Sequence, residues 1–128
     1  MKIQASAEDY LEAVLMLGQK LGKVRSVDVA NHMNFSKPTI SIVMRQFRDN
    51  GYVTFDQERN IHLTEKGLDI AKRIHERHNI LARVLMAIGV DEETAYDDAC
   101  KIEHNISEKT FECIKIFYEN FQKKGNTH

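Results

Sequence analysis

Two short helical patterns followed directly by a β-rich hairpin pattern constrain the fold of this chain more than any other feature. The helical patterns cover residues 26–33 and 36–50, and residues 52–64 form two short β-rich runs around a five-residue polar tip. Ser26 and Ser36 each stand where a helix N-cap is needed, because a serine hydroxyl can accept a hydrogen bond from a backbone N–H of the first turn. Two helices and a hairpin in this order predict a winged helix-turn-helix.

The second helix of this pair is basic on one side. Residues 36–48 contain three bases (Lys37, Arg45 and Arg48) and no acid, while Ile40 and Phe47 fall on the opposite, inward face. A locally basic helix suggests contact with a polyanion, although a simple solvated face is the alternative that charge alone leaves open. We expect base contacts in the major groove from Ser36, Pro38, Thr39, Ser41 and Arg45, and phosphate contacts from Lys37, Arg48, Arg59 and either Lys23 or Arg25.

Three further helical patterns follow the hairpin. The first is long and covers residues 65–88, the second begins after a potential cap at Asp91, and the third begins after Ser107. We therefore expect a mostly α fold: a winged-helix DNA-binding domain at 1–64, a helical domain at 65–122, and a disordered polar tail at 123–128.

The last two helices contain more apolar residues than one thin layer of helices can bury. The surplus lies around Ile106, Phe111, Ile114 and Phe117, and it predicts a helical interface in a homodimer. A dimer suits a protein that reads DNA, because two-fold proteins bind two-fold, inverted-repeat sites. We expect Cys113, in the same helix, to be a buried structural residue.

A thiol, a carboxylate and an imidazole share one face of the helix that follows Asp91. Cys100, Glu103 and His104 stand at positions i, i+3 and i+4, which are neighbours on a helix surface. All three are metal-ligand types, and the thiolate adds a soft donor to a nitrogen and an oxygen. Residues 91–104 also contain six acids against one base, and such a segment attracts cations.

A single helix rarely completes a coordination sphere, so a metal site here needs donors from other parts of the chain. Asp9 with Glu12, one turn apart, and His78 within the long helix offer them. Each has an ordinary alternative role. Carboxylates in a first helical turn usually complement the helix dipole, and a histidine on an apolar face is usually a hydrogen-bonded core residue.

The composition is ordinary for a globular protein, with 42% apolar residues, 29% charged residues and a formal net charge of −1. Two cysteines do not make a disulfide framework, and no apolar run is long enough to span a bilayer or to form a signal peptide. We expect a cytoplasmic protein with no membrane partner. No phosphate loop, nucleophile elbow or evident substrate pocket is present in the sequence, so we expect neither an enzyme nor a small organic substrate.

The sequence resembles the metal-dependent repressors typified by the diphtheria toxin repressor and the manganese transport regulator. The resemblance covers about residues 5–120 in order and spacing. It is carried by Ala7-Glu8-Asp9-Tyr10-Leu11-Glu12, Pro38-Thr39-Ile40-Ser41, Leu63-Thr64-Glu65-Lys66-Gly67, Arg77-His78-Asn79-Ile80-Leu81, Ile88-Gly89-Val90-Asp91 and Asp97-Asp98-Ala99-Cys100-Lys101-Ile102-Glu103-His104-Asn105-Ile106-Ser107.

The resemblance implies an N-terminal winged helix that binds DNA and a helical domain that dimerises and binds a divalent metal. Position by position, it implies a metal site made of Asp9, Glu12, His78, Cys100, Glu103 and His104. Cys100 is typical of the iron branch and Asp9 of the manganese branch, and Ala82 and Tyr96 replace the Glu and His of the iron branch's ancillary site. Fe2+ or Mn2+ is therefore the expected activator, with Zn2+ or Co2+ as further possibilities.

Taken together, these features predict a homodimeric, metal-activated transcriptional repressor of metal-ion homeostasis that controls Mn2+ or Fe2+ uptake genes. Two alternatives use the same residues. One is a winged-helix redox sensor that uses the Cys100 thiol without a metal, and the other is a small metalloenzyme built on Cys100, Glu103 and His104. Metal-dependent DNA binding distinguishes all three.

Overall fold

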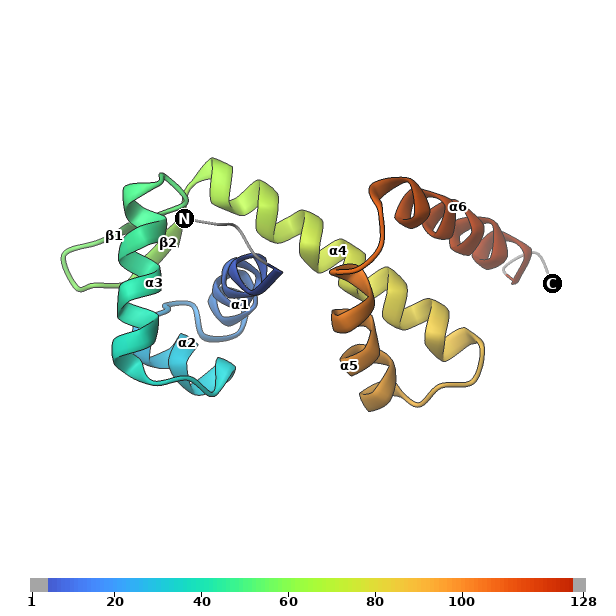
Figure 1. Ribbon diagram of the computed structural model, residues 1–128, viewed down its shortest axis with the longest axis horizontal. Coiled ribbons are helices and arrows are strands. Elements are labelled where there is room, and N and C mark those ends of the chain that lie inside the picture. Colours follow the sequence, from blue (N-terminus) through green and yellow to red (C-terminus); the bar gives the residue numbers. More distant parts are fainter. Residues whose placement is uncertain (1–4, 126–128) are drawn as a thin grey trace. The chain divides into compact units, whose positions relative to one another are not determined.

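The computed structural model describes residues 5–125 of the chain, and it confirms the predicted mostly α fold (Figure 1). In chain order the elements are α1 (Ala5–Leu21), α2 (Ser26–Met33), α3 (Lys37–Asp49), β1 (Val53–Phe55), β2 (Ile61–Leu63), α4 (Glu65–Ala87), α5 (Glu92–Glu103) and α6 (Glu108–Gly125). They form two compact units, which divide within α4 between Ile74 and His75. The predicted domain boundary, between residues 64 and 65, lies ten residues earlier, at the start of α4. The units divide later because the first turns of α4 belong to the first unit, where Ala71 is a buried core residue.

The first unit is a helix-turn-helix followed by a two-stranded hairpin. Its core is formed mainly by side chains from α1, α2, α3 and β1, and the largest fully buried ones are Phe47, Leu11, Ile40, Met44, Val29 and Val53. The rings of Tyr10 and Tyr52 pack on Phe47, with centroids 6.4 and 6.0 Å away. Because Ile40, Met44 and Phe47 recur on one face of α3, burying them turns the polar and basic residues of that helix outward.

Local sequence signals determine where α2 and α3 begin. The Thr39 N–H donates to the Ser36 hydroxyl at 3.3 Å, so the predicted cap of α3 is confirmed, with proline in the first turn. The predicted cap of α2 is wrong by one residue. Ser26 is already helical, and Arg25 takes the N-cap position because the Asp28 carboxylate accepts its backbone N–H at 2.9 Å.

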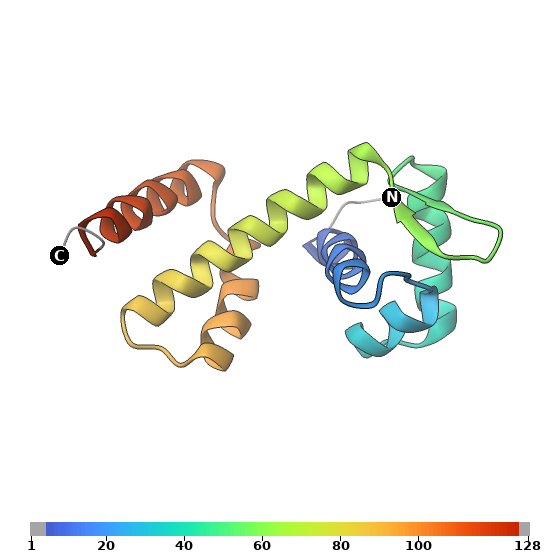
Figure 2. The same ribbon diagram turned by 180° about the vertical axis from the view of Figure 1, so that it is seen from behind.

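The hairpin is antiparallel, and its loop extends past α3 in both ribbon views (Figures 1 and 2). Val53 pairs with Leu63, Thr54 with His62 and Phe55 with Ile61. The start of α4 packs tightly against the beginning of this hairpin. A Cβ on Gly67 would collide with the backbone of Tyr52, so only glycine fits there.

The second unit consists of the later turns of α4 together with α5 and α6. Its buried core is Leu81, Ala82, Ala95, Ala99 and Phe111. Three of these five residues are alanines, which let helix backbones approach closely. The predicted caps of α5 and α6 are confirmed, because the Asp91 carboxylate and the Ser107 hydroxyl accept backbone N–H groups from Thr94 (3.0 Å) and Thr110 (3.1 Å).

Three predictions about α6 are corrected. The helix runs to Gly125, so residues 123–125 are helical rather than part of a polar tail, and residues 126–128 lie outside the described part of the chain. Phe111 is buried within the unit, so it does not belong to the apolar surplus available to a partner. Cys113 is exposed rather than buried, because it lies two residues from Phe111 and therefore on another side of the helix. Of the described helices, none combines the length and the apolar character that a membrane span requires.

Candidate nucleic-acid interface and metal centre

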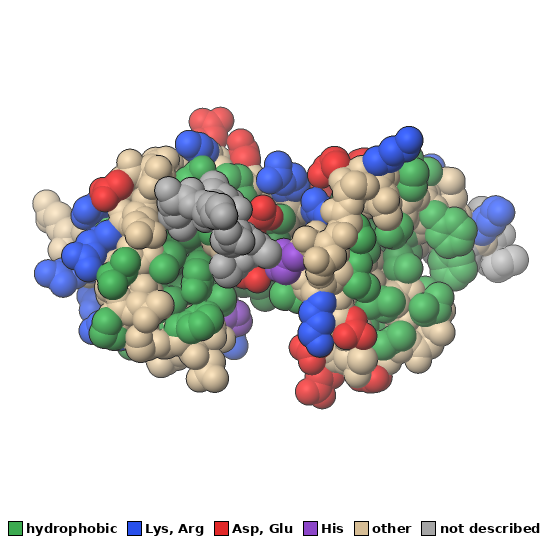
Figure 3. Space-filling model, in the orientation of Figure 1, with side chains coloured by type: hydrophobic (Ala, Val, Ile, Leu, Met, Phe, Trp, Pro, Cys, Tyr) green, Lys and Arg blue, Asp and Glu red, His purple; other side chains and the backbone are tan. Residues whose placement is uncertain are grey.

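An open groove of about 660 Å³ in the first unit is bordered by α2, α3 and the hairpin. Its described lining residues are Arg25, Ser26, Val27, Lys37, Ser41, Arg45, Arg48, Phe55 and Arg59. Five of these nine residues are basic and none is acidic. Figure 3 shows Lys and Arg side chains gathered at the end of the unit that carries α3 and the hairpin. A concave surface lined with one sign of charge attracts a polyanion.

The predicted DNA-contacting residues fall into two groups. Lys37, Ser41, Arg45, Arg48 and Arg59 line the groove. Ser36 and Thr39 hydrogen-bond to each other through their hydroxyls at 2.8 Å, and both are exposed, as is Pro38. This second group therefore forms the exposed first turn of α3, beside the groove rather than in its wall.

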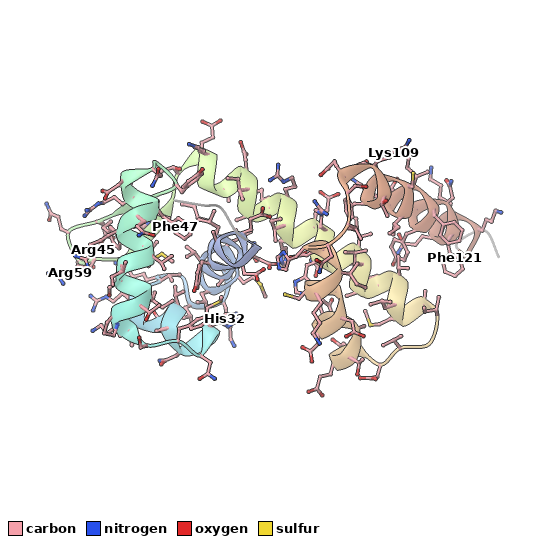
Figure 4. All side chains as sticks on the ribbon, viewed as in Figure 1. His32, Arg45, Phe47, Arg59, Lys109 and Phe121 are labelled. Carbon is pink, nitrogen blue, oxygen red and sulfur yellow. The ribbon has the colours of Figure 1, made fainter. Side chains whose placement is uncertain are left out.

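The cationic side chains come from separate elements. Arg45 extends from the outer face of α3 and Arg59 from the hairpin loop, while Phe47 points into the core (Figure 4). The Arg45 Nε donates weakly to the Ser41 carbonyl oxygen at 3.4 Å, and the Arg48 guanidinium lies 6.0 Å from the Phe55 ring centroid. Of the two alternative cations, Arg25 lines the groove, whereas Lys23 is paired with Glu58 at 3.8 Å.

In the second unit, the end of α5 brings three metal-ligand types together. The Sγ of Cys100, a carboxylate oxygen of Glu103 and an imidazole nitrogen of His104 all lie within 4.8 Å of one another. Glu103 is only 5% exposed, and Cys100 and His104 are half-buried. The structure therefore confirms that the i, i+3, i+4 spacing gathers these three donors.

The donor set fits a transition-metal ion. Metal–ligand bonds of about 2.0–2.3 Å allow two ligands of one ion to lie at most roughly 4.6 Å apart, close to the separations found here. Thiolate, imidazole and carboxylate together suit iron, cobalt or zinc, and the carboxylate also suits manganese. Burying the Glu103 carboxylate costs free energy because the charge is removed from water, and a bound cation would offset that cost.

His78 lies on α4 and is oriented by α5. Its Nε2 donates to the backbone carbonyl oxygen of Tyr96 at 2.9 Å, and its ring packs edge-on against the Tyr96 ring. A carbonyl can only accept a hydrogen bond, so Nε2 carries a proton, and in the neutral imidazole the lone pair is on Nδ1. A histidine that donates one ring N–H to a backbone carbonyl is typical of metal ligands, because this bond fixes the tautomer and the ring orientation.

Arg77, which sequence reasoning did not single out, supports the end of α5. It is 9% exposed, its Nη2 donates to the Glu103 carbonyl oxygen at 3.1 Å, and its Nη1 donates to the Glu108 carboxylate at 3.3 Å. Its guanidinium also lies 5.0 Å from the Phe111 ring centroid. Arg77 therefore ties α4 to the junction of α5 and α6 and holds the backbone that carries Glu103. An arginine next to a predicted ligand was the only sequence signal for it.

Asp9 and Glu12 lie one turn apart on α1, in the first unit. Asp9 is half-buried and Glu12 is buried. Both carboxylates are therefore withdrawn from solvent, which is uncommon for acids in the first turns of a helix.

Comparison with known proteins agrees with this architecture. Residues 2–61 match the model of an iron dependent repressor N-terminal DNA-binding domain, and residues 64–128 match that of an iron dependent repressor metal-binding and dimerisation domain. An uncharacterized HTH-type transcriptional regulator of Methanocaldococcus jannaschii, MJ0568, is 34% identical over 121 residues, covering 93% of this chain and 97% of that protein. The transcriptional regulator MntR of Escherichia coli O6:H1 is 31% identical over 117 residues, covering 91% of this chain and 76% of that protein.

Solved structures share the fold. The manganese regulator SloR superposes with a TM-score of 0.77 at 23% identity over 93% of this chain, and the chain spans about half (55%) of that protein's length. The fold and the matched domains define a winged-helix DNA-binding transcription regulator with a helical metal-binding and dimerisation domain. The chain belongs to the iron-dependent repressor family, which includes the diphtheria toxin repressor and manganese transport regulator, as the sequence resemblance indicated. Members of this family are transcriptional regulators rather than enzymes.

Proposed function

We propose that the protein is a homodimeric repressor that binds an inverted-repeat operator when loaded with a divalent transition metal, and that it controls genes for Mn2+ or Fe2+ uptake. One observation carries the proposal. The same chain contains a basic groove bordered by α3, which is the proposed recognition helix, and by the β1–β2 hairpin, which is the wing. It also contains a cluster of sulfur, nitrogen and oxygen donors at the end of α5. The first feature suits DNA and the second suits a metal signal.

The proposed ligands are Cys100, Glu103, His104, His78, Asp9 and Glu12. The short separations among the first three support their assignment. The hydrogen bond from His78 to the Tyr96 carbonyl supports the fourth, because it leaves Nδ1 as the coordinating atom. Asp9 and Glu12 are proposed from their donor type, their one-turn spacing and their restricted exposure. A metal bound by residues of α1, α4 and α5 stabilises the state that binds DNA if that state binds the metal more tightly.

Fe2+ and Mn2+ are the proposed physiological activators. The carboxylates are hard oxygen donors suited to manganese, whereas the Cys100 thiolate favours iron, cobalt or zinc. Selectivity in cells depends on geometry and availability more than on raw affinity, so we expect Zn2+ and Co2+ to bind well in vitro without being the usual signal. The names found in the comparisons, which are iron dependent repressor for the two matching family models and manganese regulator for SloR, support the same two ions.

On DNA, the proposed base contacts come from Ser36, Pro38, Thr39, Ser41 and Arg45, and the proposed phosphate contacts from Lys37, Arg48, Arg59 and Arg25. The exposed first turn of α3 supports the first set, and the basic lining of the groove supports the second. The proposed dimer surface includes Ile116, Phe117 and Phe121, which are large exposed apolar residues on α6. Such a patch rimmed by polar residues is typical of an interaction surface.

Fluorescence anisotropy with an inverted-repeat operator tests the proposal, first with Mn2+ or Fe2+ under anaerobic conditions and then with a chelator. We expect tight binding only with metal, with affinity changing about 5–150-fold for each coupled site. Cys100→Ala should lose the metal response and Cys113→Ala should keep it, which makes the exposed Cys113 a matched thiol control. Equal affinity with and without metal would contradict the switch, and a response to oxidant alone would favour the redox sensor.

A further inference from the structure

The hairpin loop is organised around one acidic side chain, Asp56. Its Oδ1 accepts the backbone N–H groups of Glu58 and Asn60, both at 2.9 Å. Its Oδ2 accepts from the Asn60 side-chain amide at 3.1 Å and from the His62 Nε2 at 3.0 Å. The carboxylate of Asp56 thus links the first residue of the loop to the far side of the loop and to β2.

These bonds hold the loop in a defined conformation. Backbone bonds from Asp56 N–H to the Asn60 carbonyl (3.1 Å) and from Arg59 N–H to the Asp56 carbonyl (3.0 Å) close the same turn, and Asn60 is buried. Within this turn Arg59 has a φ of +66°, a left-handed conformation that non-glycine residues rarely adopt. The surrounding hydrogen bonds offset the cost of that conformation.

Arg59 is also the loop residue that lines the basic groove. Its side chain direction depends on the backbone conformation at its own Cα. Without the Asp56 bonds, the loop would lose most of the contacts that keep Arg59 left-handed, and its guanidinium would point in many directions. Ordering a charged side chain before binding raises affinity, because less conformational entropy is lost when the complex forms.

We propose that Asp56 is a positioning residue for DNA binding: its carboxylate holds the wing so that Arg59 faces the nucleic acid. The proposal rests on the proposed DNA contact of Arg59. It also makes an unexpected prediction, because an acid close to a polyanion should weaken binding by charge alone. Here the acid strengthens binding through the hydrogen bonds that it accepts.

Two substitutions separate geometry from charge. Asp56→Glu keeps the charge but displaces the carboxylate by one methylene, so the carboxylate cannot accept both backbone N–H groups. We expect operator affinity to fall roughly tenfold, which is the effect of losing one charge-assisted hydrogen bond. Asp56→Asn removes the charge but retains an oxygen at the Oδ1 position, so we expect affinity within about threefold of wild type, since both backbone bonds remain. Glu58→Gln is the matched charge control. Its side chain pairs only with Lys23 among the described ion pairs, and its affinity should stay equal or rise.

Arg59→Ala and the double variant Asp56→Glu/Arg59→Ala connect the effect to Arg59. Each single variant should reduce the slope of log affinity against log salt by about one unit per wing, and the double variant should be no worse than Arg59→Ala. The ¹⁵N heteronuclear relaxation of the Arg59 and Asn60 amides gives a DNA-free readout. We expect order parameters near 0.85 in wild type and below about 0.6 in Asp56→Glu.

The outcomes distinguish this inference from the function on which it rests. If Arg59→Ala weakens binding while Asp56→Glu binds and relaxes like wild type, the positioning role is wrong and the wing contact stands. If Arg59→Ala binds like wild type, the proposed wing contact is wrong and the inference falls with it. Tighter binding by Asp56→Glu would also overturn the inference. Equal losses in Asp56→Asn and Asp56→Glu would overturn it as well, because Asp56→Asn keeps both backbone hydrogen bonds and should then have kept its affinity.

Discussion

At the residue scale, Cys100 is the proposed ligand that we expect to affect metal preference most. Its Sγ lies within 4.8 Å of the Glu103 and His104 donors. A thiol must lose a proton to bind a metal, so affinity should rise more steeply with pH than in a site of carboxylates and imidazoles alone. Cys100→Glu replaces the soft donor by a hard one, and we expect it to shift preference toward manganese.

Cobalt spectroscopy checks this assignment directly. Wild-type protein loaded with Co2+ should show an intense near-ultraviolet sulfur-to-metal charge-transfer band, and Cys100→Glu should lack it. Cys113→Ala should keep the band, because Cys113 is exposed on another helix. A wild-type spectrum without the band would mean that Cys100 only packs beside the site.

Also at the residue scale, the contacts of Asp56 predict its titration. The hydrogen bond from His62, followed by that from the Asn60 backbone, holds the pKa of the Asp56 carboxyl well below its usual range. A depressed pKa means that the contribution of this carboxylate to stability is complete above the unfolded-state value, near 3.9, and is lost as the pH falls toward the folded-state value.

The ¹³Cγ shift of Asp56, followed by NMR on the metal-free protein, should therefore stay constant between about pH 5 and 3.9, where an ordinary aspartate begins to titrate. In parallel, the difference in unfolding free energy between wild type and Asp56→Ala should shrink as the pH falls below about 4. A titration midpoint near the ordinary value would contradict the hydrogen-bond network seen here.

At the element scale, α3 is expected to read base edges with Arg45. Arg45→Ala should cost roughly 1–3 kcal/mol of operator affinity and relax preference at one base step if the contact is bidentate. Arg73→Ala is the charge-matched control, because Arg73 is an exposed arginine on α4 that does not line the groove. Binding to a set of singly mutated operators measures the preference. A uniform loss across all sequences would assign Arg45 to a phosphate instead.

The outer face of α6 carries a second element-scale prediction. Phe117 is 67% exposed, next to the exposed Ile116 and one turn before the exposed Phe121. We expect Phe117→Glu to weaken dimerisation by at least tenfold, because burying a new carboxylate in an apolar interface is costly. Sedimentation velocity measures the oligomeric state, with Leu21→Glu, an exposed apolar residue of α1, as the control. A dimer of unchanged affinity would place the interface elsewhere.

At the scale of the whole molecule, metal should act as a ligand of the native state alone. Free metal at 100 times its Kd should then raise the unfolding free energy by about 2.7 kcal/mol for one site, or somewhat less if the unfolded cysteines and histidines also bind it. Denaturant unfolding at several Mn2+ or Co2+ concentrations measures this increase, and His104→Ala should abolish it. Equal stability with and without metal would argue that the donor cluster does not bind these ions.

Much of this fold was predictable from the local sequence. The Ser36, Asp91 and Ser107 caps, the two-stranded hairpin and the inward face of α3 were all predictable, because each depends on residues within about one turn or one hairpin of each other. The grouping of Cys100, Glu103 and His104 was predictable for the same reason. Helical periodicity alone brings positions i, i+3 and i+4 to one face.

Tertiary packing decided the rest. Only the folded structure shows that Glu103 is buried and that Arg77 donates a hydrogen bond to its backbone. Only the structure shows that Phe111 is buried while Cys113 is exposed, and that His78 donates its Nε2 proton to the Tyr96 carbonyl. Each of these depends on which residue of another helix lies opposite, and one-dimensional periodicity carries no information about that neighbour. The Asp56 loop lies between the two cases: its polar tip was visible in the sequence, but its convergent hydrogen bonds required the three-dimensional turn. Local physics therefore determined the helices, the hairpin and the donor spacing, whereas long-range packing determined burial, orientation and electrostatics.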